Sequence, residues 1–381
     1  MKRAQPNQKR EKKKDIELIL SIFFIVIGVF VLLLTLVTLL RVFLTPTPSD
    51  TTATTAPQGP VTPPTPADAI FTGGRLEHLP HTTGDTADVT ENIYSDYALL
   101  LDASSGEILA QKGGNVRFNP ASMTKVMTLI VACEYLTDED LDRKLQLTQA
   151  AHDYMTTGAY AGASTSFIKK DIYLNDFVSI KDALYAIGVA SAADATYLIC
   201  VDVAGSEEAF VGLMNQKAAS LGLTNTHFDN AIGHESENNY TTASDMAAIM
   251  AYALQCDLIR EILSCNATYA CKVYKDAEGT LYPENYHWYL NSSLFNTNPD
   301  ASSRFKAYKS YYSKDFSLVN ATFGGGKTGT LGDGSTTDPW IYSLVSFATQ
   351  DGKTYIAVTG EVQTGGFVMR DAKVLYDNYI K

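Results

Sequence analysis

Residues Asn119–Leu136 read NPASMTKVMTLIVACEYL, with Ser122 and Lys125 just behind a proline and ahead of a long apolar run. On a helix, residues three apart lie on one face, so the hydroxyl of Ser122 and the amine of Lys125 can touch. A serine is a weak nucleophile until a base within hydrogen-bond reach takes its proton. A lysine acts as that base only when burial or a neighbouring cation lowers its pKa, and the apolar run supplies buried surroundings. The stretch therefore predicts a helix that carries an activated serine.

The pattern Ser-x-x-Lys alone is weak, because it occurs at Ser122, Ser166 and Ser303. Only the first of these opens an amphipathic helix behind a proline. Downstream, Phe323–Thr330 reads FGGGKTGT and places Lys327 on a glycine-rich strand, where glycines allow a substrate backbone to approach closely. This stretch lacks the spacing of a phosphate-binding loop. Ser-x-x-Lys followed by Lys-Thr-Gly is the pattern of penicillin-binding proteins and their β-lactamase relatives.

Hydrophobic periodicity predicts strands at both ends of this region and helices between them. The predicted strands are 97–102, 107–110, 323–329, 340–349 and 353–362, and the predicted helices are 122–137, 180–203, 207–221, 244–263 and 368–381. The sequence Gln350-Asp351-Gly352 is a tight turn that joins the last two strands. We expect an α/β fold with one antiparallel sheet, in which the first hairpin meets the last three strands beside a helical cluster.

The chain from about Tyr97 to Lys381 resembles the low-molecular-mass penicillin-binding D-alanyl-D-alanine carboxypeptidases. The resemblance rests on YALLLDASSGEILAQKGGNVRFNPASMTKVMT, LMNQKAASLGLTNTHFDNAIG, YTTASDMAAIMAYAL and GGKTGT. It implies a serine transpeptidase/β-lactamase-like α/β domain that removes the terminal D-Ala from peptidoglycan stem pentapeptides through an acyl-enzyme. β-Lactams are then expected as covalent inhibitors, and neither a cofactor nor a metal is expected.

Carried over by position, the resemblance assigns roles to single residues. Ser122 would be the acylated nucleophile, Lys125 its base, and Ser191 in VASAADATYL the proton relay to the leaving group. The backbone N–H groups of Ser122 and Thr330 would form the oxyanion hole. Arg370 in FVMRDAK would hold the substrate's terminal carboxylate, because a guanidinium forks onto a carboxylate; the alternative is an ordinary exposed helix arginine. The residues expected to line the substrate are Lys327, Thr328, Gly329, Thr330 and Arg370.

The chain departs from the family pattern at Ala193, where the family has the asparagine of Ser-x-Asn. Literal Ser-x-Asn strings occur at Ser236 and Ser264, but neither lies in a helix at the family's distance past Ser122, so we keep Ser191. Because a lost hydrogen bond costs ~0.5–3 kcal/mol, we expect slow but measurable turnover and a gain on Ala193→Asn. We expect the family's usual second β-rich domain and C-terminal amphipathic anchor to be missing, and we expect an N-terminal helix to replace the anchor.

The first 92 residues predict a membrane anchor and a spacer. Residues 1–15 hold seven Lys or Arg against two acids and form a cytoplasmic tail. Residues 18–40 carry no charge and are long enough to span a bilayer. We therefore predict that residues 16–44 form an uncleaved signal anchor. The alternative is a cleaved signal peptide, but no small-residue cleavage site follows the apolar run. Residues 45–92 form a linker, Thr/Pro-rich over 45–69 and then a poorly ordered approach from Ile70 to Asn92. The catalytic domain, 93–381, is expected outside the cell, held at the membrane by a single span.

The net charge bears on the binding partners, and the positions of the cysteines bear on their role. The formal net charge is −12, and the basic tail contributes +5 of it, so the rest is strongly acidic and nucleic acid is excluded as a partner. Cys133 and Cys200 fall in apolar helical stretches and are expected to be small core residues. Cys265 and Cys271 flank a short NATYA segment, so the sequence is compatible with a disulfide between them that closes a hairpin.

Two other functions remain open from the sequence. The first is a binding or sensing module that keeps the pocket but has lost its rate, which Ala193 motivates. The second is a β-lactamase, which is disfavoured because no Glu-x-x-x-Asn deacylation loop lies between Ser191 and Lys327. Turnover of a D-Ala-D-Ala peptide, or fast penicillin hydrolysis, separates these readings.

Overall fold

A computed structural model gives the structure of the chain and describes residues 66–157, 160, 174–265, 268–282, 288–291, 317–332 and 334–381. The chain divides into two units, Met1–Gly59 and Pro60–Lys381, and every described residue belongs to the second. The predicted cytoplasmic tail, the predicted membrane helix and most of the Thr/Pro-rich spacer lie outside the described residues. Within the described ranges, no helix is long and apolar enough to cross a membrane.

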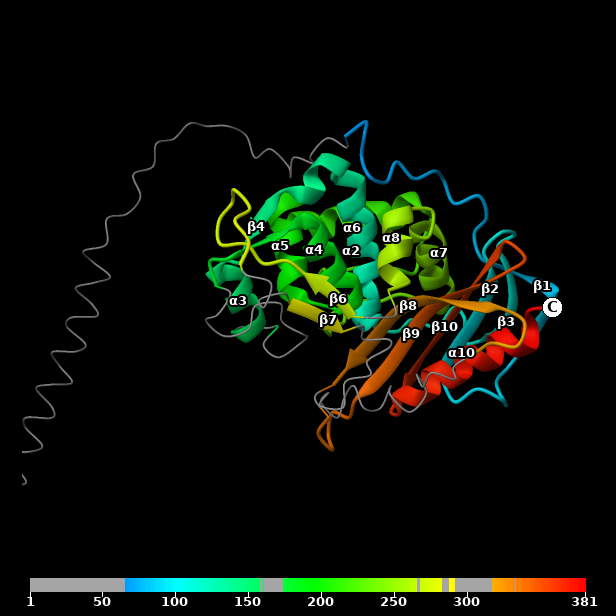
Figure 1. Cartoon of the computed structure of the whole chain (residues 1–381). Coiled ribbons are helices and arrows are strands. Elements are labelled where there is room, and N and C mark those ends of the chain that lie inside the picture. The colour runs from blue at the N-terminus through cyan, green and yellow to red at the C-terminus, as the bar shows by residue number, and fades with distance from the viewer. Residues whose placement is uncertain are drawn as a thin grey trace, which may run out of the picture. The chain divides into compact units, whose positions relative to one another are not determined.

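Six strands form the main sheet, in the order β1-β3-β2-β10-β9-β8 (Figure 1). They are β1 (His81–Asp88), β2 (Tyr97–Asp102), β3 (Glu107–Lys112), β8 (Thr322–Leu331), β9 (Ile341–Gln350) and β10 (Lys353–Val362). The prediction that the first hairpin meets the last three strands is confirmed, because β2 pairs antiparallel with β10. The prediction of a wholly antiparallel sheet is wrong at one edge, where β1 pairs parallel with β3. The sequence did not predict β1, because HTTGDTAD is polar and none of its positions is buried.

Helices cover both faces of this sheet (Figure 1). They are the 3-10 helices η1 (Ala121–Thr124) and η2 (Asp138–Asp142), and the α-helices α2 (Lys125–Tyr135), α3 (Gln149–Thr156), α4 (Ile180–Val189), α5 (Ala193–Ala204), α6 (Glu207–Ser220), α7 (Ala243–Ala253), α8 (Asp257–Leu263) and α10 (Gly365–Tyr379). Two small sheets, β4 (Lys144–Gln146) with β5 (Phe177–Ser179) and β6 (Thr268–Cys271) with β7 (Trp288–Asn291), flank the helices. The helix α7 begins as the sequence indicates, since Thr242 caps it by accepting from the N–H of Asp245.

The sheet separates two apolar cores, and alternation along its strands decides which residue enters which. On β2, Leu99 and Leu101 face the large helical cluster, whereas Ala98 and Leu100 face α10. Successive side chains of a strand point to opposite faces, so a strand buried on both sides reads as a continuous apolar run. This is why YALLLD shows no polar alternation although it lies in the middle of the sheet.

Two of the predicted helices are each broken into a pair. The predicted helix 180–203 is α4 and α5, separated at Ser191, whose φ is 59°. The predicted helix 244–263 is α7 and α8. The apolar pattern continues through both breaks because the helices on either side are buried in the same core. Periodicity reports burial, and it does not reveal a single residue that leaves the helical conformation.

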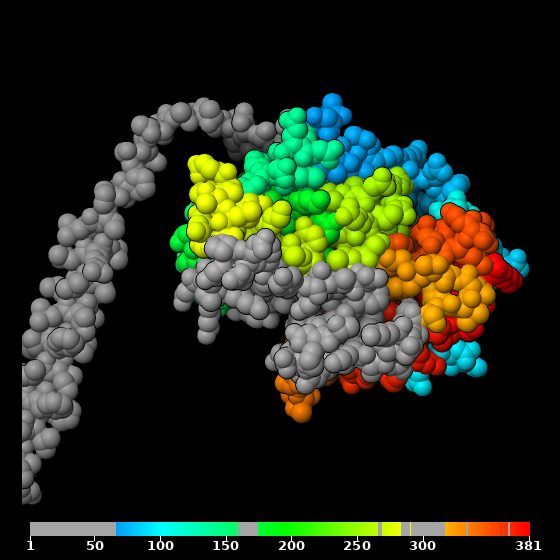
Figure 2. All heavy atoms as spheres, viewed as in Figure 1, coloured from blue at the N-terminus to red at the C-terminus, as the bar shows by residue number. Residues whose placement is uncertain are grey.

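The segment from Ala69 to Asp88 lies on the folded domain, and the expectation of a poorly ordered approach is wrong. The N–H groups of Ile70 and Phe71 donate to the carbonyls of Leu136 and Cys133, at 2.8 and 2.9 Å. The Phe71 side chain is 4% exposed, and its ring lies 4.9 Å from that of Tyr252. Figure 2 shows this segment, in blue, running over the helical layer towards the edge of the sheet.

The cysteines behave as small apolar residues. Cys133 and Cys200 are buried in the core, which confirms their prediction. Cys271 is a buried thiol whose Sγ lies 3.8 Å from the carbonyl oxygen of Asp182. The hairpin disulfide between Cys265 and Cys271 is therefore not formed.

Candidate active site

Ser122 and Lys125 lie where a 3-10 turn passes into an α-helix. Ser122 belongs to η1, and Lys125 is the first residue of α2. In a 3-10 turn, side chains three apart eclipse one another, which stacks the two groups more closely than an α-helix does. The Nζ of Lys125 lies 3.2 Å from the Oγ of Ser122. Lys125 is fully buried and Ser122 is half-buried, so the pair has a protected amine and an accessible hydroxyl.

The loop from Asn230 to His234 holds the amine of Lys125 from the other side. Lys125 Nζ donates to the carbonyl of Ile232 at 2.7 Å, and Thr128 Oγ1, one turn further along α2, donates to the carbonyl of Ala231 at 2.7 Å. Asn230 closes the loop by accepting from the N–H groups of Gly233 and His234. The sequence reading missed this role, although FDNAIG stands among the stretches of the resemblance.

Gly233 lets this loop approach the serine turn. Its φ is +79°, and a Cβ placed on it would lie 1.6 Å from the carbonyl oxygen of Ala121. Ala121 itself has a φ of 49°, which is a costly conformation for a residue with a side chain. The backbone beside Ser122 is therefore held in a strained shape by a contact that only glycine permits.

A second hydroxyl–amine pair is formed by Ser191, between α4 and α5, and Lys327, on β8. The Nζ of Lys327, on β8, donates to the Oγ of Ser191 at 3.1 Å. Ser191 stands in the break between α4 and α5, and its left-handed backbone turns its side chain out of the helical course. Both side chains are buried. The literal Ser-x-Asn serine at Ser236 instead bonds Asp229 on an exposed surface.

The glycine-rich strand β8 packs against the serine turn. A Cβ placed on Gly329 would lie 3.0 Å from the carbonyl of Pro120 and 3.1 Å from the Cβ of Ala121. The glycines before Lys327 serve close contacts within the protein, because a Cβ on Gly325 would lie 2.1 Å from the carbonyl of Leu263. The sequence reading had assigned these glycines to the approach of a substrate.

Ala193 lies in a closed apolar cluster beside the two pairs. It is 0% exposed and forms a small core with Met155 of α3 and Ile232, whose carbonyl binds Lys125. Tyr154 and Tyr160 pack against this cluster, with ring centroids 4.8 Å apart. The position where the family carries an amide is thus filled by apolar packing.

The remaining predicted site residues are placed as follows. Thr328 is buried on β8, and its carbonyl accepts from Lys327 Nζ at 3.0 Å; Thr330 lies two residues further along the same strand. Arg370 lies on α10, where its Nη1 is 2.8 Å from Asp371 and its guanidinium stacks 4.3 Å from the ring of Tyr94. Among the described residues, Arg370 contacts Asn92, Asp371 and Tyr94, none of which belongs to the Ser122 or Ser191 pair. Ser166 and Ser303 lie outside the described residues.

The described residues offer no candidate site for a metal ion. No group of three or more His, Cys, Asp or Glu side chains there could hold a metal ion. The arrangement that the structure does show is two serine–lysine pairs on facing elements. A base beside an accessible serine is suited to nucleophilic catalysis.

Curated proteins that are similar to this chain are D-alanyl-D-alanine carboxypeptidases. The bacterial relative D-alanyl-D-alanine carboxypeptidase DacF of Bacillus subtilis is 36% identical over 157 residues, which are 41% of this chain and 38% of DacF. DacC of Escherichia coli, another D-alanyl-D-alanine carboxypeptidase, is 35% identical over 153 residues, which are 40% of this chain and 37% of DacC. The aligned part thus spans well under half the length of these relatives.

Solved structures share the fold. The crystal structure of the Streptomyces K15 DD-transpeptidase superposes with a TM-score of 0.57 at 24% identity, covering 76% of this chain and 97% of that one. The family profile of D-alanyl-D-alanine carboxypeptidases matches residues 83–364, which is well over half of the chain and includes Ser122, Lys125, Ser191 and Lys327. The chain therefore belongs to the D-alanyl-D-alanine carboxypeptidase family, peptidase family S11.

Proposed function

We propose that this protein is a serine-type D-alanyl-D-alanine carboxypeptidase acting on the stem pentapeptides of peptidoglycan. The observation that carries the proposal is the pair formed by Ser122 and Lys125, 3.2 Å apart, with the amine buried and the hydroxyl accessible. Family membership and the second pair, Ser191 with Lys327, support it.

In the proposed reaction, Lys125 takes the proton of Ser122 as Oγ attacks the carbonyl carbon of the penultimate D-Ala. An amine accepts a proton only in its neutral form, which burial favours. The negative charge that develops on the carbonyl oxygen is stabilised by the backbone N–H groups of Ser122 and Thr330. The C–N bond then breaks as Ser191 passes a proton to the leaving nitrogen and recovers one from the Lys125 ammonium, so D-Ala departs as the free amine and both residues regain their starting protonation. Water hydrolyses the remaining ester and restores the serine hydroxyl.

Recognition of the peptide is assigned to β8 and α10. The strand residues Lys327, Thr328, Gly329 and Thr330 would lie along the substrate backbone. Arg370 is proposed as the cation for the terminal carboxylate, as the resemblance implies. Its Nη1 is engaged by Asp371, so binding a substrate would recruit another edge of the guanidinium or break that ion pair.

We also propose that residues 16–44 anchor the protein in the cell membrane as a single span, with the catalytic domain outside. The basic tail of residues 1–15, the uncharged run 18–40 and the Thr/Pro-rich spacer behind it support this topology. A cell-surface location agrees with a peptidoglycan substrate and with β-lactams as covalent inhibitors.

The test of the activity is mass spectrometry of the protein after treatment with penicillin, together with D-Ala release from a D-Ala-D-Ala peptide. We expect an adduct on the peptide that contains Ser122, and loss of the adduct in Ser122→Ala and Lys125→Ala. Labelling that persists in Ser122→Ala would show that another serine is the nucleophile. Penicillin binding without D-Ala release would favour a binding module, which the apolar packing of Ala193 also motivates, and rapid penicillin hydrolysis would indicate a β-lactamase.

A further inference from the structure

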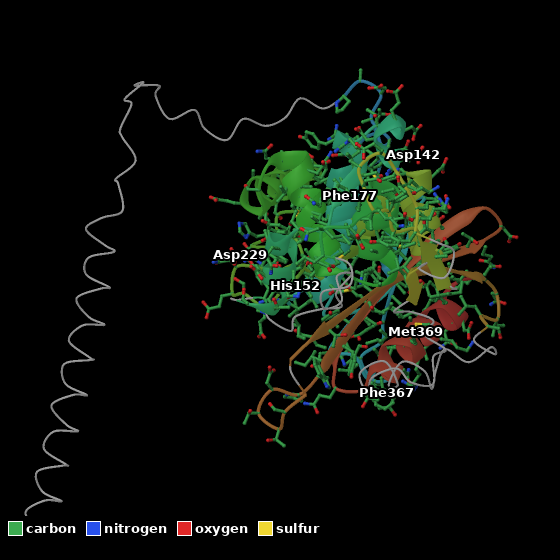
Figure 3. The ribbon with its side chains drawn as sticks, turned by 60° about the vertical axis from the view of Figure 1, so that its left-hand side comes forward. Asp142, His152, Phe177, Asp229, Phe367 and Met369 are labelled. Atoms are coloured by element: carbon green, nitrogen blue, oxygen red, sulfur yellow. The ribbon has the colours of Figure 1, made fainter. Side chains whose placement is uncertain are left out.

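Glu207, at the first position of α6, connects two elements beside the serine–lysine pair. Its Oε1 accepts from the hydroxyl of Tyr154 at 2.6 Å and from the N–H of Ala231 at 3.0 Å. Tyr154 belongs to α3, and Ala231 belongs to the loop that holds Lys125. Figure 3 labels Asp229, the residue just before this loop, and His152 on α3, the helix that carries Tyr154.

Ala231, which precedes the residue whose carbonyl Lys125 uses, is held at both its N–H and its C=O. The N–H of Ala231 is bound by Glu207, and its carbonyl is bound by Thr128 at 2.7 Å. The following carbonyl, of Ile232, accepts from Lys125 Nζ at 2.7 Å. These two bonds hold the peptide planes on both sides of Ala231, which restricts its φ and ψ and limits the positions that the next peptide unit, with the Ile232 carbonyl, can take.

The surroundings of Glu207 are partly shielded from water, since Glu207, Tyr154 and Tyr160 are each half-buried. Burial, reinforced by the charge of Glu207, raises the pKa of Tyr154 well above its usual value, so the phenol stays a proton donor. Burial, with the charges of Glu207 and Asp229, also raises the pKa of Tyr160 to about 12. A hydrogen bond to a carboxylate in such surroundings is stronger than one between neutral groups.

We infer that Glu207 is a positioning residue for the proposed reaction: it holds the Ala231–Ile232 backbone so that the Ile232 carbonyl keeps the Lys125 amine aimed at Ser122. The inference rests on the proposed function, because the amine matters only if it takes the serine proton. The plainer alternative is that Glu207 serves α6 alone, as an acid in the first turn that interacts favourably with the helix dipole.

Glu208 provides a matched control for that alternative. It is the second acid in the same first turn, it is exposed, and it is not part of the contacts described above. Glu207→Gln is the second comparison, because it removes the charge but keeps an oxygen that can accept from Tyr154 and Ala231. A helix-dipole role predicts that Glu207→Gln and Glu208→Ala each behave like Glu207→Ala. A positioning role predicts that Glu207→Ala is impaired most, Glu207→Gln less, and Glu208→Ala not at all.

The kinetic experiment is stopped-flow acylation by a fluorescent penicillin, which separates the dissociation constant of the first complex from the acylation rate constant. In Glu207→Ala we expect the acylation rate constant to fall ~10–100-fold, as loss of a charge-assisted hydrogen bond implies, with the dissociation constant unchanged. Glu207→Gln, which keeps an acceptor but loses the charge, should fall by less than Glu207→Ala and by no more than ~10-fold, and Glu208→Ala should be unchanged. An unchanged acylation rate in Glu207→Ala, or an equal loss in Glu207→Gln, would overturn the inference.

Hydrogen–deuterium exchange tests the loop without requiring activity. Peptides that cover residues 228–234 should exchange faster in Glu207→Ala than in Glu208→Ala, because the bond to the Ala231 N–H is lost. Equal exchange in the two variants would also overturn the inference. If the natural protein is not acylated at all, the proposed function fails, and the exchange result still decides whether Glu207 holds the loop.

Discussion

At the scale of single residues, Ala193 replaces the asparagine of the family pattern, whereas both serine–lysine pairs are kept. The alanine is fully buried with Met155 and Ile232, and the two tyrosines Tyr154 and Tyr160 close the cluster. The side chains of Met155 and Ile232, with which Ala193 packs, offer an amide no strong hydrogen-bond partner. A buried amide without a partner costs about 1–3 kcal/mol.

The first prediction reverses the sign that the sequence suggested for this position. We expect Ala193→Asn to lower the free energy of unfolding by about 1–3 kcal/mol and to reduce turnover, since the amide displaces the apolar contacts that flank Ile232. Ala193→Ser, which is smaller, should have a lesser effect. Thermal melts and D-Ala release from a D-Ala-D-Ala peptide measure the two quantities. A higher kcat/KM with an unchanged melting temperature would show that the amide reaches the substrate.

The second prediction concerns the closest backbone approach in the site. Gly233→Ala should abolish acylation and destabilise the fold by about 4 kcal/mol or more, because the new methyl would overlap the Ala121 carbonyl. Gly205→Ala is the matched control, since Gly205 has nearly the same φ, +78°, but nothing within 4 Å of the added Cβ. The control should cost about 1 kcal/mol. Similar losses of stability in the two variants would mean that backbone strain, and not the overlap, governs Gly233.

At the scale of elements, the break between α4 and α5 allows Ser191 to pair with Lys327. A continuous helix would leave Ser191 on a helical surface, whereas the break turns its hydroxyl towards Lys327 on β8. The start of α4 is fixed just as firmly. Asp182, in its first turn, accepts from Ser179 Oγ and from the hydroxyl of Tyr269 on β6.

The third prediction follows from the burial of Asp182, which raises the pKa of its carboxyl above 3.8 despite these hydrogen bonds. The folded state therefore holds this proton more tightly than the unfolded state does. The stabilisation from this group is full below pH 3.8 and is lost as the pH rises through the raised pKa. Relative to Asp182→Asn, which does not titrate here, the natural protein should lose stability as the pH rises from about 4 to 7.

Thermal or urea unfolding at several pH values checks this slope. Asp276 gives a control of opposite sign, because its hydrogen bonds with Thr280 lower the pKa of its exposed carboxyl. Stability that rises with pH relative to Asp182→Asn would contradict the assignment.

At the scale of the whole molecule, the described unit begins well before the first predicted strand. The Ala69–Gly74 segment is tied to α2 through backbone bonds, and the hydroxyl of Tyr252 joins it to Glu134, which is paired with Lys217 at 2.7 Å. The strand β1 then adds an edge to the sheet. The folded domain therefore includes the chain from Ala69 onward, and the expected start at residue 93 is too late.

The fourth prediction combines this boundary with the proposed anchor. Protease added outside intact cells should release a soluble fragment that begins between residues 45 and 66, because the Thr/Pro-rich stretch is cut and the tied segment is protected. Intact-mass measurement of the fragment gives its first residue. A stable fragment that starts near residue 93 would contradict the docking of Phe71 and β1. Recovery of a mature protein that already lacks residues 1–44 would contradict the anchor.

The sequence alone determined the features that depend on neighbours along the chain. Three-residue spacing was enough to pair Ser122 with Lys125, and apolar runs with tight turns were enough to predict five of the six strands of the main sheet. These predictions worked because periodicity and turn chemistry act within a few residues.

Only the tertiary structure decided the rest. The partner of Lys125 at Ile232 lies 107 positions away, and the partner of Lys327 at Ser191 lies 136 positions away. The left-handed turn at Ser191, the cluster around Ala193 and the polar edge strand β1 are likewise set by contacts with distant elements. Local preferences are worth a few tenths of a kcal/mol per residue, about 0.5 for many, and burial against a distant element outweighs them. For this reason the motifs could be read from the sequence, whereas the arrangement that makes them a site could not.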